Sequence, residues 1–202
     1  MPKRWYCLPL SLIMALAVLT LFGCRQREGS LVVGISADYE PFEYIDENGN
    51  YAGFDIELMA EIGRRLGLTI EWQDIAFDGL IGSLQTDKID AIIAAMSAMP
   101  ERQQRVDFTA PYFIGADAII AAEGSSIAIG RNEDMAGHKV GVQAGTIQED
   151  WIDKNLDAEV FRYEHAEQAI IDLRSGRIGV VTMIITPRIP LSAVIGHFVC
   201  SE

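Results

Sequence analysis

Short apolar runs alternate with amphipathic segments over most of the chain. The apolar and β-branched runs predict strands at 31–35, 68–72, 89–95, 114–122, 139–142 and 159–163. The segments that follow several of them predict helices over 53–66, 77–88, 147–155 and 166–175. The run at 89–95 is too short for a helix and suits a parallel strand that is buried on both faces. The pattern therefore predicts an α/β protein.

The clearest helix signal lies over 53–66. Four apolar residues recur there at a spacing of four, namely Phe54, Leu58, Ile62 and Leu66, and they predict one packed face. Glu61 can pair with Arg64 or Arg65 on the other side, and Gly67 ends the helix. Just before this helix, Asn48-Gly49 is the sharpest hairpin signal in the chain.

The stretch after the 89–95 strand is the first candidate binding element. Pro100 and Glu101 suit the first turn of a helix, which places Ser97 and Arg102 just beyond the carboxyl end of a strand, where open α/β sheets bind small ligands. A guanidinium there can hold a carboxylate through two charge-assisted hydrogen bonds, and a serine hydroxyl can add a third. The alternative is a surface salt bridge and a helix cap.

The first 23 residues read as a secretory leader. Lys3 and Arg4 precede a mostly apolar run from Leu8 to Phe22, which is shorter than a membrane span. The ending Leu21-Phe22-Gly23-Cys24 resembles a lipobox, which implies cleavage before Cys24, lipid attachment to it, and a polar tether at 24–30. The alternative is an uncleaved anchor helix. Cys200 is left without an obvious partner, so no disulfide framework is implied.

Composition narrows the function further. Half of the residues are hydrophobic and 22% are charged, with a net charge of −13, as in a folded acidic domain. This charge argues against nucleic-acid binding. No His or Cys cluster suggests a metal site, and no glycine-rich loop suited to phosphates appears. We therefore expect no metal and no cofactor.

Several motifs together resemble the solute-binding protein family 3, the polar amino-acid receptors of ABC importers. They are the loop Asp38 to Phe42, the segment Gly53-Phe54-Asp55, and the order Asp90-Ala91-Ile92, Ser97, Pro100-Glu101-Arg102 and Val106 to Tyr112. The likeness runs from about Leu31 to about Ile178. It implies a type II periplasmic-binding-protein fold with two Rossmann-like lobes joined by a hinge. Lobe 1 would cover 31–114 and a partial lobe 2 would cover 115–178.

The resemblance also implies a ligand site. Arg102 would hold the ligand's α-carboxylate with help from Ser97, and the turn at Gly145 and Thr146 would add contacts at a helix start, where free N–H groups favour anions. Tyr39 and Phe77 would pack on the ligand's side chain; the alternatives are core packing for Tyr39 and a helix-start contact for Phe77. Glu43 would reach a cationic side chain.

Two positions depart from the pattern within the likeness. Ser36 stands where members that bind basic amino acids often have Asp, and Ile147 stands where a second Thr is common.

The pattern breaks after Ile178. The residues at 179–202 lack the acid that normally binds the ligand's α-ammonium, and they lack the return crossover to lobe 1. One interpretation is a truncated or frameshifted product in which 179–202 form a divergent tail. The other is a short variant whose tail still supplies a strand through Val180 to Ile185.

The function that the resemblance implies is a non-enzymatic, lipid-anchored receptor. It would bind a free amino acid, polar and possibly basic, and present it to the membrane subunits of a permease, at the periplasmic or outer face of the cytoplasmic membrane. One alternative is an enzyme similar to cyclohexadienyl dehydratase, with Glu43 or Asp38 as its acid or base. Another is a truncated remnant without function. A sensor or peptidoglycan lyase built on the same module would need an appended domain, which this chain lacks.

Overall fold

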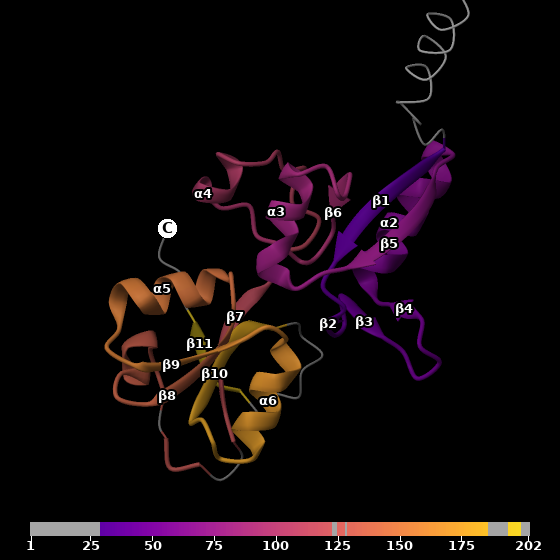
Figure 1. Ribbon diagram of the computed structural model, residues 1–202. Helices are drawn as coiled ribbons and strands as arrows, with labels where there is room; N and C mark the ends of the chain where they lie inside the picture. The colour runs from indigo at the N-terminus through magenta and orange to yellow at the C-terminus, as the bar shows by residue number, and fades with distance from the viewer. Residues whose placement is uncertain (1–28, 123–124, 128, 186–193, 199–202) are drawn as a thin grey trace, which may run out of the picture.

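The computed structural model describes residues 29–122, 125–127, 129–185 and 194–198, which form two lobes (Figure 1). The elements of lobe 1 are β1 (Ser30–Ile35), β2 (Asp38–Tyr39), β3 (Glu43–Ile45), β4 (Tyr51–Ala52), α2 (Phe54–Leu66), β5 (Thr69–Asp74), the 3₁₀ helix η2 (Phe77–Gly79), α3 (Leu80–Gln85), β6 (Ala91–Ile92) and α4 (Pro100–Gln103). Those of lobe 2 are β7 (Ala116–Ala121), η3 (Asn132–Met135), β8 (Lys139–Gln143), α5 (Ile147–Asn155), β9 (Glu159–Tyr163), α6 (Ala166–Arg174), β10 (Val180–Ile185) and β11 (Val194–Phe198). The α/β class is therefore confirmed.

Lobe 1 is built on a parallel sheet of order β5-β1-β6, beside which β2, β3 and β4 form a small antiparallel sheet. The β3–β4 hairpin closes at the predicted turn, where the Asp46 carboxylate accepts hydrogen bonds from the backbone N–H groups of Asn48 and Asn50. The core of the lobe lies between β1 and α2 and includes Val33, Ile35 and Met59.

Helix α2 has the predicted bounds but not the predicted buried face. Phe54, Ile62 and Leu66 are 46%, 37% and 64% exposed. The buried residues of the helix are Asp55, Ile56, Met59 and Gly63. A spacing of four residues overshoots the 3.6-residue turn, so such a row drifts around the helix, whereas 56, 59 and 63 stay on one side. The predicted packed face was therefore wrong at three of its four residues, and only the half-buried Leu58 packs against the core.

Strand β6 is shorter than predicted. It has two residues instead of seven, although Ile89, Ile93 and Ala94 are buried as expected. The pairing with β1 ends at Ile92, and the chain turns at Ala95, which has a left-handed backbone with φ of 44°. The turn that follows leads into α4, which starts with Pro100 at its first position as predicted.

Lobe 2 contains a five-stranded sheet of order β11-β7-β10-β8-β9. Its middle strand, β10, is antiparallel to β7 and parallel to β8. The residues of β10 fall in the segment that departs from the family pattern, so the strand through Val180 to Ile185 that the second interpretation allowed is present. Val180 is buried with Ile119, Val140 and Ile152 in the core of this lobe.

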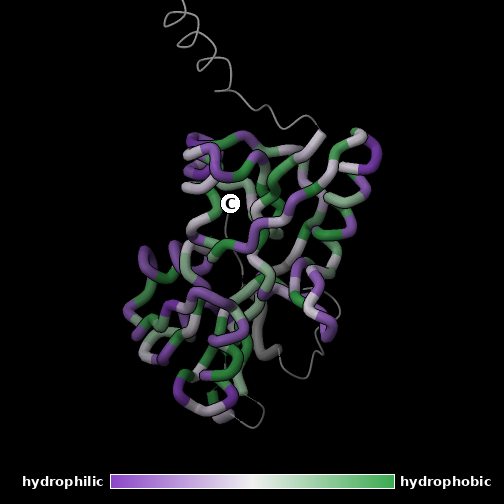
Figure 2. The backbone as a smooth tube through the Cα atoms, turned by 45° about the vertical axis from the view of Figure 1, so that its right-hand side comes forward, coloured by the Kyte–Doolittle hydropathy of each residue, from purple (hydrophilic) through white to green (hydrophobic). Residues whose placement is uncertain are grey.

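Hydrophobic residues concentrate along the strands of both lobes, while hydrophilic residues predominate on the outer turns (Figure 2). One exception is the segment that leads from lobe 1 into β7, where Tyr112, Phe113 and Ile114 are 40%, 39% and 91% exposed. Within the described part of the chain, no helix combines the length and apolar character that crossing a membrane requires. The leader and Cys24 lie outside the described residues.

Candidate ligand-binding cleft

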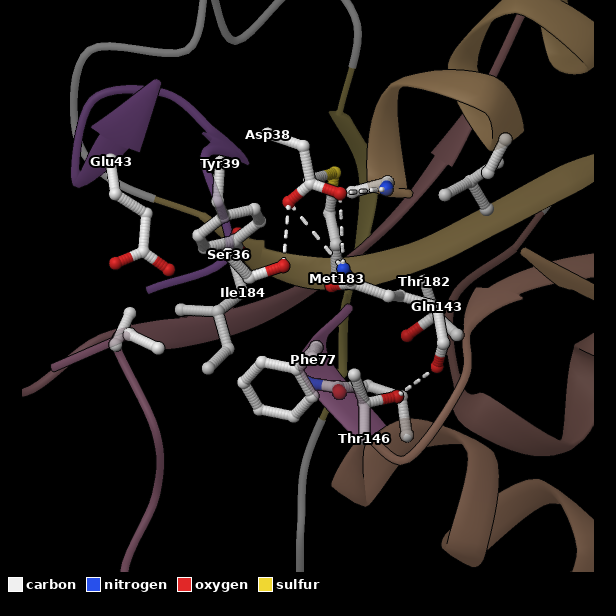
Figure 3. A pocket seen from close by; sticks show the side chains of 16 residues that line it. Ser36, Asp38, Tyr39, Glu43, Phe77, Gln143, Thr146, Thr182, Met183 and Ile184 are labelled. Carbon is white, nitrogen blue, oxygen red and sulfur yellow. Dashed lines mark hydrogen bonds between the residues drawn. The ribbon is translucent and has the colours of Figure 1, made fainter. Parts of the chain in front are cut away.

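A cavity lies where the two lobes meet (Figure 3). Lobe 1 lines it from β2, β3, η2 and the loops that follow β1 and β6, and lobe 2 lines it from β8, α5, α6 and β10. The cavity has a volume of about 40 Å³, which is room for only a few waters. The lobes are therefore in close contact around this cavity, and they must move apart there to admit an amino acid. A larger cavity of about 580 Å³ lies beside it in lobe 1 and reaches Ile184 of lobe 2.

Asp38 is the most connected lobe 1 residue of the cavity. One carboxylate oxygen, Oδ2, lies 2.8 Å from His165 Nδ1 and accepts from the backbone N–H of Ala166 at 3.1 Å. It also accepts from Gln143 Nε2 at 3.3 Å. The carboxylate of lobe 1 thus caps the first turn of α6 in lobe 2. Burial raises the pKa of Asp38, and the contacts with His165, Ala166 and Gln143 oppose that rise.

Arg102 also joins the two lobes. Its guanidinium donates to the backbone carbonyl of Ser97 at 2.8 Å and to that of Gly145 at 2.9 Å. The Cζ atom lies 5.4 Å from the centre of the Phe77 ring, within cation–π range. Burial lowers the pKa of Arg102, and Asp150 partly offsets this. Among the described residues, no carboxylate forms an ion pair with this guanidinium.

The start of α5 already holds an anion. The backbone N–H of Gly145 donates to the Glu149 carboxylate at 2.6 Å, and the Thr146 hydroxyl accepts from the N–H of Glu149 as an N-cap. The hydroxyl of Thr146 donates to the Gln143 carbonyl at 2.8 Å. Glu149 is itself paired with Arg162. In the closed arrangement, the Gly145 N–H and the Thr146 hydroxyl are therefore occupied by the protein's own residues.

The two aromatic candidates lie on the cavity wall. Tyr39 stacks on Phe42 with ring centres 5.8 Å apart, and its hydroxyl donates to the backbone carbonyl of Ile184 in lobe 2. Burial, then the charges of Asp117 and Asp38, raise the pKa of Tyr39 well above its ordinary value. Phe77 lines the cavity from η2. Figure 3 shows Phe77 and Thr146 on the side of the cavity opposite Asp38.

Glu43 is buried beside a second acid, Asp55. Burial and the neighbouring Asp55 raise the pKa of Glu43 to about 10, so the side chain is neutral at pH 7. Asp55 accepts from the Ala95 N–H at 2.7 Å and from the Tyr112 hydroxyl at 2.9 Å. Asp55 thus holds the loop that leads to Ser97, while Glu43 faces the cavity as a carboxylic acid.

The predicted site residues divide into two groups. Tyr39, Glu43, Phe77 and Thr146 line the cavity, whereas Arg102 and Gly145 form a contact between the lobes outside its lining. Ser97 accepts from Arg102 within lobe 1 and lines a second, neighbouring cavity. The prediction from the sequence did not include Gln143 or Thr182, and it included Asp38 only as the acid or base of an enzyme. Gln143 and Thr182 stand on strands of lobe 2, where only the packing of the sheet decides which side chains face the cleft. Among the described residues, no group of His, Cys, Asp and Glu is arranged to hold a metal ion.

Comparison with known proteins assigns the family. The model of the bacterial extracellular solute-binding proteins, family 3, matches residues 31–176. The chain belongs to this family. Arginine-binding extracellular protein ArtP of Bacillus subtilis is 37% identical over 155 residues, which are 73% of this chain and 58% of that protein. The chain spans about three-fifths of the length of such curated relatives.

Solved structures of this family agree with the fold. A mutant of arginine-bound ArgBP from T. maritima superimposes with a TM-score of 0.81 at 37% identity, over 85% of this chain and 83% of that chain. An ancestral amino acid-binding protein, described as a precursor of cyclohexadienyl dehydratase, superimposes with a TM-score of 0.74 at 35% identity, over 78% of this chain and 70% of that one. The type II periplasmic-binding-protein fold expected from the motifs is therefore confirmed.

Proposed function

We propose that this family member is the receptor of an amino-acid ABC importer, and that it binds the α-carboxylate of a free amino acid at Arg102. The proposal rests mainly on the environment of Arg102. Its guanidinium is half-buried at the lobe junction and has only backbone carbonyls and an aromatic face as partners among the described residues.

A carboxylate is a better partner for this guanidinium than the Gly145 carbonyl. Hydrogen bonds between ionised groups contribute about 1.5–3 kcal/mol, against about 0.5–1.5 kcal/mol for neutral ones. When the lobes separate, the Nη2 group that now meets Gly145 becomes free for a ligand oxygen. Two relatives whose names or titles state arginine binding support an amino acid as the ligand.

The other predicted residues take supporting roles in this proposal. Ser97 and the Gly145-Thr146 turn assist at the carboxylate, and Tyr39 and Phe77 enclose the ligand's side chain. Glu43, as a neutral acid, offers a hydrogen bond to that side chain. The partners would be a permease and, through a lipid on Cys24, the outer face of the cytoplasmic membrane.

A thermal melt of the full chain with each common amino acid tests the receptor function. A ligand at 100 times its dissociation constant adds about 2.7 kcal/mol to the free energy of unfolding, so one or a few amino acids should raise the midpoint by several degrees. The Arg102→Lys variant keeps the charge but loses the planar fork, and we expect at least a tenfold weaker affinity.

The matched control is Arg105→Lys. Arg105 is an exposed arginine that donates to Gln85 at 2.8 Å and does not line the cavity between the lobes, so this variant should bind as the unmodified chain does. An unmodified chain whose midpoint no amino acid shifts, or equal affinities for the two variants, would contradict the proposal.

A second candidate is a dehydratase, favoured by the ancestral structural relative and by two acids, Asp38 and Glu43, that line the cavity. Incubation with prephenate or arogenate separates the two functions, because only an enzyme would convert them and a receptor leaves them unchanged.

A further inference from the structure

The ionisable side chains that line the closed cavity are acidic. Two carboxyl groups, those of Asp38 and Glu43, line it, and the described lining residues include no lysine or arginine. Because Glu43 shares its surroundings with Asp55 and keeps its proton, Asp38 is the side chain that can bring negative charge to the cavity. An ionised carboxylate only accepts hydrogen bonds, so its complement is a donor, and a charged donor is the strongest one.

Asp38 has room for another donor. Its Oδ2 atom lies 2.8 Å from His165 Nδ1 and accepts from the backbone N–H of Ala166 at 3.1 Å and from Gln143 Nε2 at 3.3 Å. Its Oδ1 atom meets only Ser36 Oγ and Gln143 Nε2, both at 3.5 Å, the outer limit of a hydrogen bond. Asp38 is only 8% exposed, so the unused capacity of Oδ1 faces the cavity and not bulk water.

The second candidate acceptor is the hydroxyl of Thr182, which lies across the cleft in lobe 2. Thr182 is 2% exposed, lines the cavity from β10, and its hydroxyl has no hydrogen-bond partner among the described residues. Buried polar groups nearly always have a partner. Figure 3 shows Thr182 next to Gln143, on the lobe 2 side of the cavity. Asp38 and Thr182 thus offer a charged and a neutral acceptor from opposite lobes.

We propose that Asp38 binds a protonated nitrogen of the ligand, an ammonium or guanidinium group, with the Thr182 hydroxyl as a second acceptor. This assignment rests on the proposed receptor function and deepens it. It gives the ligand a second charged contact besides the one at Arg102. It also makes β10 part of the binding surface, although this strand lies in the segment that departs from the family pattern.

The test compares three probes by titration calorimetry on the full chain. L-arginine carries an α-ammonium and a guanidinium, L-citrulline has a neutral side chain of the same shape, and 5-guanidinopentanoate lacks the α-ammonium. Loss of one charge-assisted hydrogen bond weakens binding about 10- to 100-fold. We expect Asp38→Asn to weaken the binding of L-arginine by this factor. It should weaken equally the binding of whichever analogue retains the nitrogen that Asp38 contacts. The other analogue should bind the variant and the unmodified chain alike.

The pattern across the probes identifies the nitrogen. If Asp38→Asn loses affinity for both L-arginine and L-citrulline, Asp38 binds the α-ammonium. If it loses affinity for both L-arginine and 5-guanidinopentanoate, Asp38 binds the guanidinium. Thr182→Val, which keeps the shape and removes the hydroxyl, should weaken the same two probes about 2- to 10-fold. The control Glu47→Gln removes one charge on the exposed β3–β4 turn and should change no affinity more than twofold.

Two results would overturn the assignment while leaving the receptor function intact. Equal weakening of all three probes by Asp38→Asn would mean that the carboxylate only holds the lobes together through α6. Unchanged affinity for all three would mean that it has no role in binding. An unmodified chain that binds none of the probes would contradict the receptor function for this class of ligand, and the Asp38 assignment with it. A circular dichroism spectrum of each variant confirms its fold.

Discussion

At the scale of single residues, the buried acid pair Glu43 and Asp55 has a consequence for stability. Glu43 is 1% exposed and its Oε2 atom has no hydrogen-bond partner among the described residues. The same holds for Oδ1 of Asp55. Two buried carboxyl groups cannot both ionise at low cost, so the folded chain retains a proton that the unfolded chain releases.

This proton makes stability depend on pH. The pKa of Glu43 is about 10 in the folded chain, against an ordinary value of 4.5. Its contribution is therefore fully present below about pH 4.5 and is lost as pH rises toward 10, with a slope of at most about 1.4 kcal/mol per pH unit. We predict that Glu43→Gln, which has no proton to lose, flattens the fall in unfolding free energy between pH 5 and pH 9.

Urea unfolding at pH 5, 7 and 9 measures this slope. The control is Glu47→Gln, which removes a carboxylate of the same kind from the exposed turn of the same hairpin and should leave the slope as it is. An unchanged slope in Glu43→Gln would show that the proton is not held at this pair.

The same scale shows which site residues a sequence can identify. Arg102 and Ser97 lie beside a proline and an acid that mark a helix start, and Tyr39 lies in a recognisable loop, so local signals were enough to name them as candidates. Asp38 stands next to Tyr39, yet its contacts with His165 and Ala166 join residues more than 120 positions apart. Thr182 faces the cleft because β10 lies between β7 and β8. Such placements depend on how the lobes and sheets assemble, which short-range patterns do not contain.

At the scale of elements, bounds were easier to predict than faces. Helix α5 at Ile147–Asn155 and strand β9 at Glu159–Tyr163 have the predicted ends, because caps and breakers act locally. The packed face of α2 was wrong because hydrophobicity alone does not rank residues: Gly63 is buried and Leu66 is not. A Cβ at Gly63 would lie 2.7 Å from Ile70 of β5, so the helix approaches the sheet where its side chain is smallest.

Two isoleucines of α2 test which face carries the packing. Ile56 is 8% exposed and Ile62 is 37% exposed. Truncation of a buried isoleucine to alanine costs about 2–5 kcal/mol, and less where water already reaches the side chain. We predict that Ile56→Ala lowers the free energy of unfolding by about 2–4 kcal/mol and that Ile62→Ala lowers it by about 1 kcal/mol or less. Urea titration of both variants measures these free energies. Equal losses in the two variants would mean that the face predicted from the sequence pattern does carry packing.

At the scale of the whole molecule, the described lobes close on each other through a few polar contacts. Asp38 caps α6, the Tyr39 hydroxyl reaches the Ile184 carbonyl, and Arg102 reaches Gly145. Each contact joins a lobe 1 side chain to backbone of lobe 2, and the cavity between them is nearly filled. Such contacts are weak enough individually for the lobes to open, and the balance between open and closed forms then sets the apparent affinity for a ligand.

Gly145 is a point where this balance can be shifted by one small substitution. Its φ is +77°, and a Cβ there would lie 2.8 Å from Cβ and 2.9 Å from Cα of Asp78 in lobe 1. Backbone and Cβ atoms cannot move aside as the end of a flexible side chain can, so the lobes themselves must part. We predict that Gly145→Ala increases the radius of gyration of the ligand-free chain in small-angle X-ray scattering and weakens ligand binding.

The chain offers a control that separates this clash from backbone strain. Gly176 has a nearly equal φ of +74°, but a Cβ there would meet nothing within 4 Å. An alanine at either position carries a similar cost for a left-handed backbone, so Gly176→Ala should lower the melting temperature while scattering and binding as the unmodified chain does. The larger radius should appear in Gly145→Ala alone. If both variants scatter alike, the contact between Gly145 and Asp78 does not hold the closed form, and closure depends on Asp38 and Tyr39 instead.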